Sequence, residues 1–370
     1  MIRVLVVEDL PVVREFLTRV LETDSEIRVI GTATDGEEGV AKTASLKPDV
    51  VTMDIHMPRL DGFKATRSIM ESFPTPIVIV SGSPSADGAA TSFRALEAGA
   101  LAVVKRPVGF VDPGHAAAVR ELVQTVKLMS EVKVVRRRSR PAGPGGGPET
   151  APPPATLAGT ERAPVRLVAI GASTGGPPVL KAILSALPGT FSAAVVVVQH
   201  IAEGFTAGFV EWLADGCRLP VKQAAHGDVI VAGRVLVAPN GRHVRLERSG
   251  TLSLVLDPPE EGHRPSVSYL FRSVAETYGK HAVGVLLTGM GRDGGEGMRQ
   301  LRQCGAVTIA QDAKSSVVHG MPGEAIRLGG VQLVAPPEQI AETLLTLTRG
   351  VAPPHRPGEG GARSRNEPSW

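Results

Sequence analysis

Ser173 stands in a sequence pattern that presents a nucleophile. Residues 166–178 read RLVAIGASTGGPP, and G-A-S-T-G matches the G-x-S-x-G pattern of serines held on a tight strand-to-helix turn. A helix that begins near Pro177 would place free N–H groups and positive dipole beside the serine, where they could stabilise an oxyanion. Two other interpretations share the motif: a glycine loop that holds the phosphates of a dinucleotide, and a serine that only caps a helix.

Two more side chains with acid–base chemistry follow apolar runs in the same region. His200 ends the run AAVVVVQH, and Asp293 lies in the glycine-rich loop after AVGVLLTG. The carboxyl ends of parallel strands form one edge of an open sheet, so Ser173, His200 and Asp293 are expected to converge. A lone histidine or aspartate at such a place is more often structural, but the three together favour a nucleophile, a base and an orienting carboxylate. The chain order Ser, His, Asp differs from that of α/β-hydrolases and indicates another hydrolase family.

A second group of reactive side chains lies near the N-terminus. Glu8 and Asp9 follow the run IRVLVV, and Asp54 follows DVVTM. In a parallel sheet of order 2-1-3-4-5 these runs are neighbours, so the three carboxylates would meet at one edge. Such a cluster is costly without a cation, and its oxygen ligands suit Mg²⁺, so the sequence predicts a metal-assisted phosphoryl acceptor site. The alternative is that each carboxylate only forms a turn or caps a helix.

A hydroxyl and two cations follow the next runs of the same region. Ser81 ends PIVIVS, and Lys105 and Arg106 end LAVVKR. They would surround the acidic crevice, where a hydroxyl and a cation could hold the oxygens of an added phosphoryl group. Successive residues of a strand point to opposite faces, so Lys105 and Arg106 are expected to point in opposite directions.

The elements that must position these residues come in two series, which predict an α/β chain of two domains. Residues 1–129 hold five β-branched runs separated by helical patterns, so we expect a doubly wound sheet of five parallel strands. The alternation resumes over residues 165–349 and predicts a second doubly wound, mostly parallel α/β domain. Residues 130–164 are rich in Arg, Pro and Gly and are predicted to be a flexible linker, and residues 350–370 a disordered tail.

The composition narrows the classes of partner and compartment. The 40 basic and 37 acidic side chains give a net charge of +3, so nucleic acid is not an expected partner. The two cysteines are far apart in the sequence, so they predict neither a disulfide framework nor a zinc site. This cysteine usage is typical of proteins in the reducing cytosol. Acidic residues interrupt the apolar N-terminus, and no apolar stretch is long enough to span a bilayer. We therefore expect a cytoplasmic protein that is not inserted in a membrane.

Four N-terminal segments resemble the receiver domain of bacterial response regulators over its whole length: VVEDLPVVREFL, VTMDIHMPRLDGF, IVIVSGS and ALEAGALAVVKRP. The resemblance implies a flavodoxin-like fold with Asp54 as the phosphate acceptor. It also implies a Mg²⁺ ion held by Glu8, Asp9, Asp54 and the backbone carbonyl of His56, with Ser81 as the switch hydroxyl. Receivers usually carry lysine at the position of Arg106, and a planar guanidinium is not equivalent to a compact ammonium.

Five C-terminal segments are similar to the catalytic domain of chemotaxis protein-glutamate methylesterases: AIGASTGGPPVL, VVVQHIAEGFT, HRPSVSYLFRSVAE, VGVLLTGMGRDGGEGM and IAQDAKSSVVHGMPGEAI. The resemblance implies Ser173 as nucleophile, His200 as general base and Asp293 as the carboxylate that fixes the imidazole. Backbone amides near Thr174 and Met290 would then form the oxyanion hole, and no cofactor is implied for this site.

The function implied by the resemblance is adaptation in chemotaxis-type signalling. The chain would hydrolyse glutamate γ-methyl esters on chemoreceptors, release methanol, and deamidate receptor glutamines at the same site. Its partners would be methyl-accepting chemoreceptors as substrate and a chemotaxis-type histidine kinase as phosphodonor, so it would work at the periphery of receptor arrays. The unphosphorylated receiver would cover the Ser173 edge, and phosphorylation of Asp54 would expose it.

Two departures from the family pattern and two other functions also follow from the sequence. Arg292 stands where an amide residue is common, and His319 replaces an aromatic residue. His263 and Arg264 match a family motif and could line the substrate cleft, although solvated loop residues are the commoner interpretation of such a pair. A nucleotide-binding oxidoreductase is disfavoured because residues 190–194 offer no acidic ribose ligand. A non-catalytic scaffold is the remaining alternative.

Overall fold

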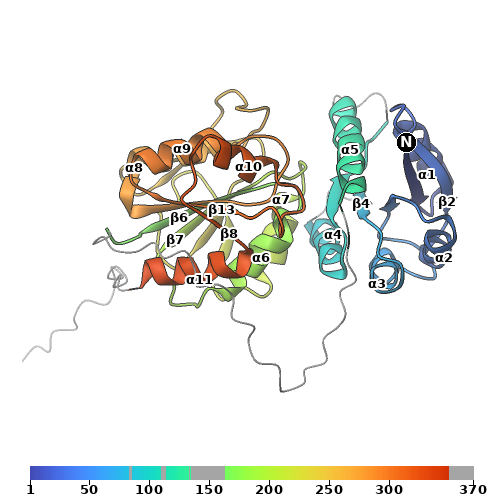
Figure 1. Cartoon of the computed structure of the whole chain (residues 1–370), viewed down its shortest axis with the longest axis horizontal. Helices are drawn as coiled ribbons and strands as arrows, with labels where there is room; N and C mark the ends of the chain where they lie inside the picture. Colours follow the sequence, from blue (N-terminus) through green and yellow to red (C-terminus); the bar gives the residue numbers. More distant parts are fainter. Residues whose placement is uncertain (83–85, 110–113, 133, 135–162, 350–370) are drawn as a thin grey trace, which may run out of the picture.

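The computed structural model describes residues 1–82, 86–109, 114–132, 134 and 163–349. They form two α/β units that lie side by side in Figure 1. Most of the predicted linker 130–164 and all of the predicted tail 350–370 lie outside the described residues. Within the described ranges, none of the helices combines the length and apolar character needed to cross a membrane.

The first unit is a five-stranded parallel sheet in the order β2-β1-β3-β4-β5, as the sequence predicts. Its strands are β1 Ile2–Val7, β2 Ile27–Ala33, β3 Val50–Met53, β4 Ile77–Ser81 and β5 Ala102–Lys105. Its helices are α1 Pro11–Leu21, α2 Gly36–Leu46, α3 Gly62–Ser72, α4 Ala86–Ala98 and α5 His115–Ser130. Helices α1 and α5 cover one face and α2, α3 and α4 the other, so the predicted doubly wound fold is confirmed (Figure 1).

The second unit is a seven-stranded sheet in the order β14-β13-β12-β6-β7-β9-β8, with every neighbouring pair parallel. Its strands are β6 Leu167–Ala172, β7 Ala194–Gln199, β8 Val221–Gln223, β9 Val235–Val237, β12 Ala282–Leu286, β13 Val307–Gln311 and β14 Leu333–Ala335. A separate antiparallel hairpin is formed by β10 His243–Leu246 and β11 Leu252–Val255. The prediction of a doubly wound, mostly parallel domain is confirmed.

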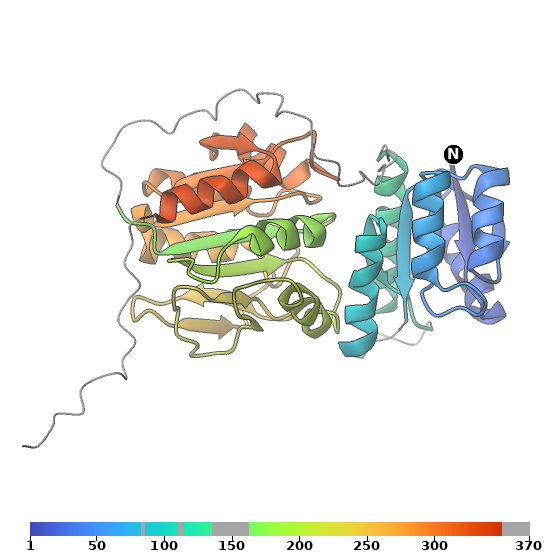
Figure 2. The same cartoon turned by 90° about the horizontal axis from the view of Figure 1, so that it is seen from below.

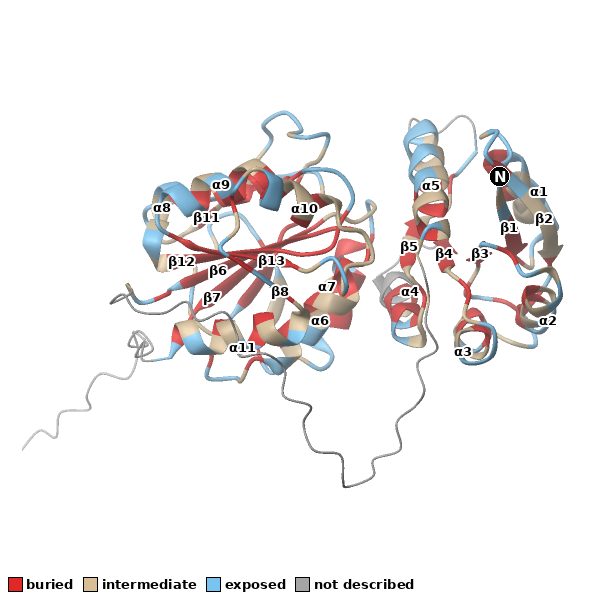
Figure 3. Cartoon of the chain, viewed as in Figure 1, coloured by how far each residue is buried: buried red, intermediate tan, exposed pale blue. Residues whose placement is uncertain are grey.

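Helices cover both faces of the second sheet. Figure 1 shows α8, α9 and α10 on one face and α6, α7 and α11 on the other. Their bounds are α6 Gly176–Ala186, α7 Thr206–Ala214, α8 Val267–Thr277, α9 Gly295–Gln303, α10 Gly320–Arg327 and α11 Pro337–Thr348, with one 3-10 turn at Gly279–His281. Because both faces are covered, every residue of β6, β7 and β12 is buried (Figure 3), which explains the continuous apolar runs in the sequence.

The two units contact each other through α4 and α7. Phe93 of α4 packs against the rings of Phe205, Phe209 and Trp212, and all four side chains are buried. Figure 2 shows that the side of the first unit formed by α4 and α5 faces the second unit. We call the four rings the aromatic interface cluster. It joins the two units at the side of the second sheet where the candidate catalytic residues lie.

An ion pair borders the aromatic interface cluster. Lys181 Nζ of α6 lies 2.6 Å from Glu97 Oε1 of α4, and Trp212 Nε1 donates to the same oxygen at 3.0 Å. The Lys181 ammonium also lies 4.3 Å from the centre of the Trp212 ring. Apolar contact and charge pairing therefore hold the same two surfaces together.

Candidate active site

Ser173 lies on the turn between β6 and α6. Its N–H donates to the Thr288 carbonyl at 3.0 Å, and the Gly176 N–H donates to the Ser173 carbonyl at 2.8 Å. Gly175 adopts φ +76°, a left-handed conformation that favours glycine and closes the turn within two residues. Helix α6 begins at Gly176, close to the predicted start near Pro177. The turn presents the serine at the carboxyl edge of the sheet.

The order of the strands brings the three candidate catalytic residues together. Strand β6 pairs with β12 on one side and with β7 on the other, so Ser173 follows the middle strand. His200 follows β7 directly, and Asp293 lies in the loop between β12 and α9. All three residues line one cleft of about 970 Å³.

His200 and Asp293 form a buried hydrogen bond. His200 Nε2 lies 2.9 Å from Asp293 Oδ2, and since a carboxylate only accepts, Nε2 carries the proton. The opposite nitrogen, Nδ1, is buried and has no hydrogen-bond partner within the described ranges. Among the residues that the structure describes, no hydrogen bond joins this ring to the Ser173 hydroxyl, as is common before a substrate is bound. Nδ1 is therefore the ring atom with a lone pair available to accept a proton.

The N-terminus of α8 binds the Asp293 carboxylate. Oδ1 accepts hydrogen bonds from the Ser266 hydroxyl at 2.9 Å and the Ser268 N–H at 2.8 Å, and Oδ2 accepts one from the Val267 N–H at 2.7 Å. Burial alone would raise the pKa of Asp293, but the hydrogen bond and charge of His200 and the amides of Ser268 and Val267 hold that pKa well below its usual range. Asp293 is thus ionised and fixed in orientation.

Two backbone amides at the cleft could bind a developing oxyanion. Thr174 and Met290 both line the cleft, and within the described part of the chain neither N–H donates a hydrogen bond. A side chain at Gly289 would meet Ser173 Cβ at 2.7 Å, so only glycine allows the second loop to approach the serine this closely. The Thr174 carbonyl accepts a hydrogen bond from Thr288 Oγ1 at 3.0 Å, which links the two loops.

Sequence reasoning missed Gln199, which braces the two loops of the site. Gln199 is buried, and its Nε2 donates at 2.8 Å to the carbonyls of both Ser173 and His200. It missed the role of Ser266 as well, which caps α8 by accepting from the Tyr269 N–H at 3.2 Å while donating to Asp293. A polar residue at the end of an apolar strand run was the available signal for Gln199.

The first unit forms the opposite wall of the cleft. Residues of β5 and α5, among them Arg120 and Gln124, line the cavity that also contains Ser173 and His200. The aromatic interface cluster contributes Phe93 to the same lining. A substrate that reaches Ser173 must therefore enter between the two units or displace the first unit.

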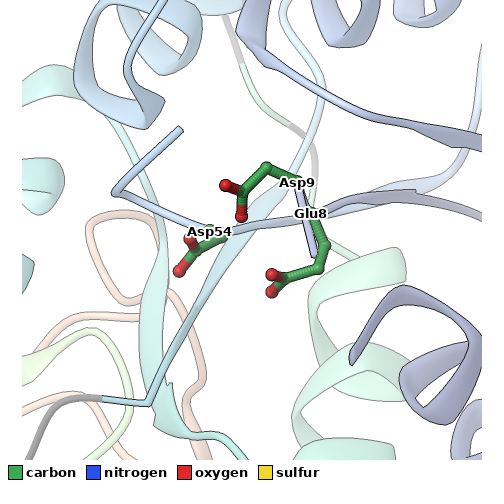
Figure 4. Close-up of side chains that lie close together, drawn as sticks. All are labelled: Glu8, Asp9 and Asp54. Atoms are coloured by element: carbon green, nitrogen blue, oxygen red, sulfur yellow. The ribbon is translucent and has the colours of Figure 1, made fainter. Parts of the chain in front are cut away.

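The first unit carries its own site, formed by three acidic side chains (Figure 4). Ligand oxygens of Glu8, Asp9 and Asp54 all lie within 4.8 Å of one another. Val7 and Met53 are paired in the sheet, which is why the residues that follow them meet. Burial and then the Asp54 charge raise the pKa of Glu8 to about 7, and burial also raises the pKa of Asp54. A divalent cation would relieve this repulsion, so the donor set fits Mg²⁺.

Of the two cations at the end of β5, Arg106 is the one that the described residues place at this acidic site. Arg106 Nη1 lies 3.5 Å from Glu8 Oε2, whereas the charge of Lys105 acts on Glu121 of α5. The expected opposite orientation of the two side chains is therefore found, and the structure does not bring Lys105 to the predicted switch site. Ser81 is buried at the end of β4 and pairs in register with Lys105.

His56 occupies the loop after Asp54. It lies two residues beyond Asp54, and its side chain is exposed. The ring of another histidine, His243, is buried: it accepts from the Ser266 N–H at 3.2 Å and lies 3.1 Å from the Pro258 carbonyl. His243 is thus a structural residue behind α8.

Comparison with known proteins assigns both units. The family model "CheB methylesterase" matches residues 168–344, and the model "Response regulator receiver domain" matches residues 4–112. A protein-glutamate methylesterase/protein-glutamine glutaminase of Nitrosospira multiformis is 52% identical, over 94% of this chain and 97% of that protein. A protein with the same name from Syntrophus aciditrophicus is 49% identical over 95% of this chain and 100% of that protein. The catalytic domain of the Thermotoga maritima CheB methylesterase, a crystal structure, is 36% identical, covers 50% of this chain and all of that domain, and has a TM-score of 0.49.

Proposed function

Because the chain belongs to the CheB methylesterase family, joined here to a response-regulator receiver domain, we propose that it hydrolyses glutamate γ-methyl esters on chemoreceptors with Ser173, His200 and Asp293. The observation that carries the proposal is the buried His200–Asp293 hydrogen bond of 2.9 Å at the same sheet edge as Ser173. The receiver makes the hydrolysis phosphorylation-regulated, and the product is the free glutamate that chemotactic adaptation requires.

Acylation starts at the Ser173 hydroxyl. As Ser173 Oγ attacks the ester carbonyl carbon, His200 Nδ1 takes the hydroxyl proton and Nε2–H stays donated to Asp293. The carbonyl oxygen becomes an oxyanion, which the amides of Thr174 and Met290 stabilise. The Nδ1 proton then passes to the leaving methoxide, and methanol departs from the glutamyl-serine ester.

Deacylation repeats the same proton transfers with water. His200 Nδ1 takes a proton from the attacking water and returns it to Ser173 Oγ, so the free glutamate leaves and the site is restored. A glutamine side chain passes through the same steps with ammonia as leaving group, which gives the glutaminase activity that the relatives' name includes. The ionised Asp293 stabilises the imidazolium that forms in both halves of the reaction.

The receiver match implies a Mg²⁺-binding phosphorylation site, and we place it at the acidic cluster. Asp54 is the proposed phosphate acceptor; Glu8, Asp9, Asp54 and the His56 carbonyl are the proposed metal ligands. A bound Mg²⁺ ion would neutralise charge on the transferred phosphoryl group. Arg106, already beside Glu8, would pair with a phosphoryl oxygen, and the buried Ser81 hydroxyl would donate to another.

Regulation follows from the position of the receiver over the catalytic cleft. In the unphosphorylated form, α4 and α5 limit access to Ser173, and the aromatic interface cluster holds them there. Phosphorylation of Asp54 would reorganise Ser81, at the end of β4, and the α4 surface that follows it, and so weaken this contact. The methylesterase site is then open to a receptor helix.

The proposed partners follow from the family to which the chain belongs. The substrate is a methylated cytoplasmic segment of a chemoreceptor, the phosphodonor is a histidine kinase of the chemotaxis type, and the enzyme works in the cytoplasm at receptor arrays. The proposed domain limits are 1–129 for the receiver and 165–349 for the esterase, joined by residues 130–164. The His200–Asp293 pair, which lines the same cleft as Ser173, supports the esterase over the oxidoreductase and scaffold alternatives, because neither of those functions needs a general base at the serine.

Methanol release tests the proposal. The purified chain is incubated with a methylated receptor fragment, with and without a small phosphodonor plus Mg²⁺, beside Ser173→Ala and Asp54→Asn variants. Release should require Ser173, and phosphodonor should increase it only when Asp54 is intact. Absence of release from the wild-type chain, with or without phosphodonor, would refute the esterase assignment.

A further inference from the structure

The ring of His263 stacks on the ring of His200. The two ring centres are 3.8 Å apart, and the planes are inclined by 9°. His263 lines the same cleft as Ser173 and is partly buried. The sequence offered His263 only as a cleft-lining residue, but this parallel contact is with the residue that moves the proton in the proposed reaction.

A tight turn holds His263 in this position. Glu260 and His263 exchange two backbone hydrogen bonds, of 3.1 and 2.9 Å, across Glu261 at φ 53° and Gly262 at φ 81°. Two positive φ angles in succession are typical of a type I′ turn, which reverses the chain in the fewest residues. The backbone of His263 is thus fixed relative to Glu260.

Two ion pairs tie the turn to elements that carry Asp293 and its ligands. Glu260 accepts two hydrogen bonds from the Arg272 guanidinium of α8, at 3.0 and 2.5 Å. Glu261 Oε2 accepts from Arg292 Nε at 2.5 Å, and Arg292 directly precedes Asp293. Arg292, the departure from the common amide residue, therefore joins the turn to the loop of the catalytic carboxylate.

The stacked ring is neutral at physiological pH. Burial and then the charge of His200 lower the pKa of His263 to about 4, and Asp293 opposes this only in part. His200 and Asp293 are the charged groups that act on the ring from the packed elements. A neutral aromatic face can lie against His200 both before and after His200 gains a proton, whereas a second cation there would be repelled.

His200 needs such support because only one edge of its ring is bonded. Its Nε2 is held by Asp293, but Nδ1 has no partner in the part of the chain that the structure describes, so the single hydrogen bond leaves the ring free to tilt about that contact. A parallel ring at van der Waals distance restricts this tilt without occupying Nδ1. We propose that His263 is a positioning residue, whose ring holds His200 in the plane that keeps Nε2 on Asp293 and points Nδ1 toward the Ser173 proton. This inference deepens the proposed function and rests on the proposed role of His200.

The test distinguishes three effects of His263: stacking by its aromatic ring, chemistry specific to its imidazole, and support of the fold. His263→Ala removes the ring, His263→Phe keeps a neutral stacking face, and His226→Ala is a matched control at an exposed histidine outside the cleft. Two readouts are used on the full chain: the rate at which a fluorophosphonate labels Ser173, and the downfield proton resonance of the His200–Asp293 hydrogen bond. Thermal unfolding of each variant shows whether it folds.

We expect His263→Ala to label Ser173 about 10-fold to 100-fold more slowly, a part of the 10²–10⁴ that a positioned general base contributes. The downfield resonance should broaden in that variant, and kcat for ester hydrolysis should fall with little change in KM. His263→Phe should stay within about threefold of wild type, since the stacking face that restricts His200 remains. Equal labelling rates in folded wild type and His263→Ala, or a Phe variant as slow as the Ala variant, would overturn the inference.

Failure of the proposed function gives a different result. If the chain reacts with the fluorophosphonate at Ser173 but releases no methanol from a methylated receptor fragment, the substrate assignment is wrong. The labelling rates of the His263 variants then still decide whether the stacked ring positions His200.

Discussion

At the scale of single residues, the site depends on how completely Asp293 is surrounded by donors. Both of its oxygens accept hydrogen bonds, from the α8 N-terminus and from His200. The negative charge of Asp293 therefore stabilises both the N-terminus of α8 and the orientation of the His200 imidazole. An amide at this position would satisfy only some of those donors and would bring an N–H group toward others.

Asp293→Asn should lower kcat for methyl-ester hydrolysis by about 10³-fold to 10⁴-fold, because the neutral side chain neither fixes the His200 tautomer nor stabilises its protonated form. Methanol release from a methylated receptor fragment measures the loss. Asp257→Asn is the control, since the Asp257 carboxylate does not line the cleft and accepts the Tyr269 hydroxyl at 2.6 Å. A kcat within tenfold of wild type would contradict the assigned role of Asp293.

The depressed pKa of His263 predicts an acid-sensitive contribution to stability. The folded protein resists protonation of this ring down to about pH 4, whereas the unfolded chain takes up the proton near pH 6.5. The free energy of unfolding should therefore fall as pH is lowered from about 6.5 to about 4, by on the order of 2 to 3 kcal/mol from this group. Urea unfolding of wild type and His263→Phe across this range should show a smaller acid loss in the variant. Parallel curves would show that His263 is not protonated differently in the two states.

The sequence predicted which residues lie at the strand ends of the candidate site, but it did not predict the contacts between their side chains. Ser173 and His200 were expected at the carboxyl ends of neighbouring strands, and the structure has them after β6 and β7. This expectation needs only the topology of the sheet, because adjacent parallel strands end at the same edge. The stacking of His263 on His200 and the two hydrogen bonds of Gln199 could not be predicted, because each depends on side-chain packing between segments distant in sequence. The same limit applies to the hydrogen bond between the Ser266 hydroxyl and Asp293.

At the scale of elements, the N-terminus of α8 is part of the site. The helix directs the Val267 and Ser268 N–H groups at Asp293, and Ser266 caps the helix through its hydroxyl. A helix end that needs acceptors and a carboxylate that needs donors thus satisfy each other in a buried place. The turn 260–263 is tied to the same helix through Arg272, so α8 supports both the carboxylate and the stacked ring.

Ser266→Ala should cost about 1 kcal/mol of stability, as the loss of an N-cap hydroxyl does elsewhere. The same change removes one donor from Asp293, so ester hydrolysis should fall about tenfold. Ser266→Thr keeps the hydroxyl and should retain both properties more fully, and Ser249→Ala, at an exposed turn, should change neither. Chemical unfolding and methanol release provide the two measurements. Wild-type activity in a destabilised Ser266→Ala would limit the residue to helix capping.

Element-level prediction succeeded for long apolar runs and failed for short ones. The five strands predicted for residues 1–129 are present, and so are the strands predicted before Ser173, His200 and Asp293, since a run covered on both faces is continuously apolar. Strands β8 and β14 lie at the two edges of the second sheet and were not predicted. Each has only three residues, which is too short to show a periodic pattern in the sequence. The β10–β11 hairpin was also missed, because its pairing depends on the turn between the two strands and not on a long run.

At the scale of the whole molecule, one interface is proposed to control both access to Ser173 and its regulation. The aromatic interface cluster and the Lys181–Glu97 pair join the units beside the cleft that contains Ser173. The partly exposed ion pair contributes little to stability by itself, but its position makes it a sensitive place to weaken the contact. Substitutions at this ion pair should change the rate of ester hydrolysis by the unphosphorylated chain more than they change the chemical steps at Ser173.

Reversing one charge of the pair should open the cleft. Lys181→Glu places two carboxylates together and should raise ester hydrolysis without phosphodonor several-fold, while reducing the further increase on phosphorylation. Combining it with Glu97→Lys should restore part of the low basal rate, because the opposite charges then face each other again. Methanol release with and without phosphodonor is measured for both single variants and the double variant. Identical basal rates in all four proteins would mean that this contact does not limit access.

Removal of divalent cations should separate the two sites. A chelator should abolish the response to phosphodonor, since Glu8, Asp9 and Asp54 would repel each other and the incoming phosphoryl group. The basal hydrolysis that depends on Ser173 should continue unchanged. Phosphate incorporation into the chain and methanol release, both measured with and without chelator, show the two effects. A phosphodonor response that persists in chelator would exclude a required metal.

The central place of β6 also determines when the enzyme can first become active during synthesis. Its neighbour β7 follows closely along the chain, but β12 and the Asp293 loop come more than a hundred residues later, and they must insert on the other side of β6. Such distant pairings close large loops and form slowly. A nascent chain that ends before Asp293 lacks the carboxylate that fixes His200, so it should hydrolyse receptor esters far more slowly than the finished chain. Full hydrolytic activity is therefore expected only after the second domain has been synthesised and folded.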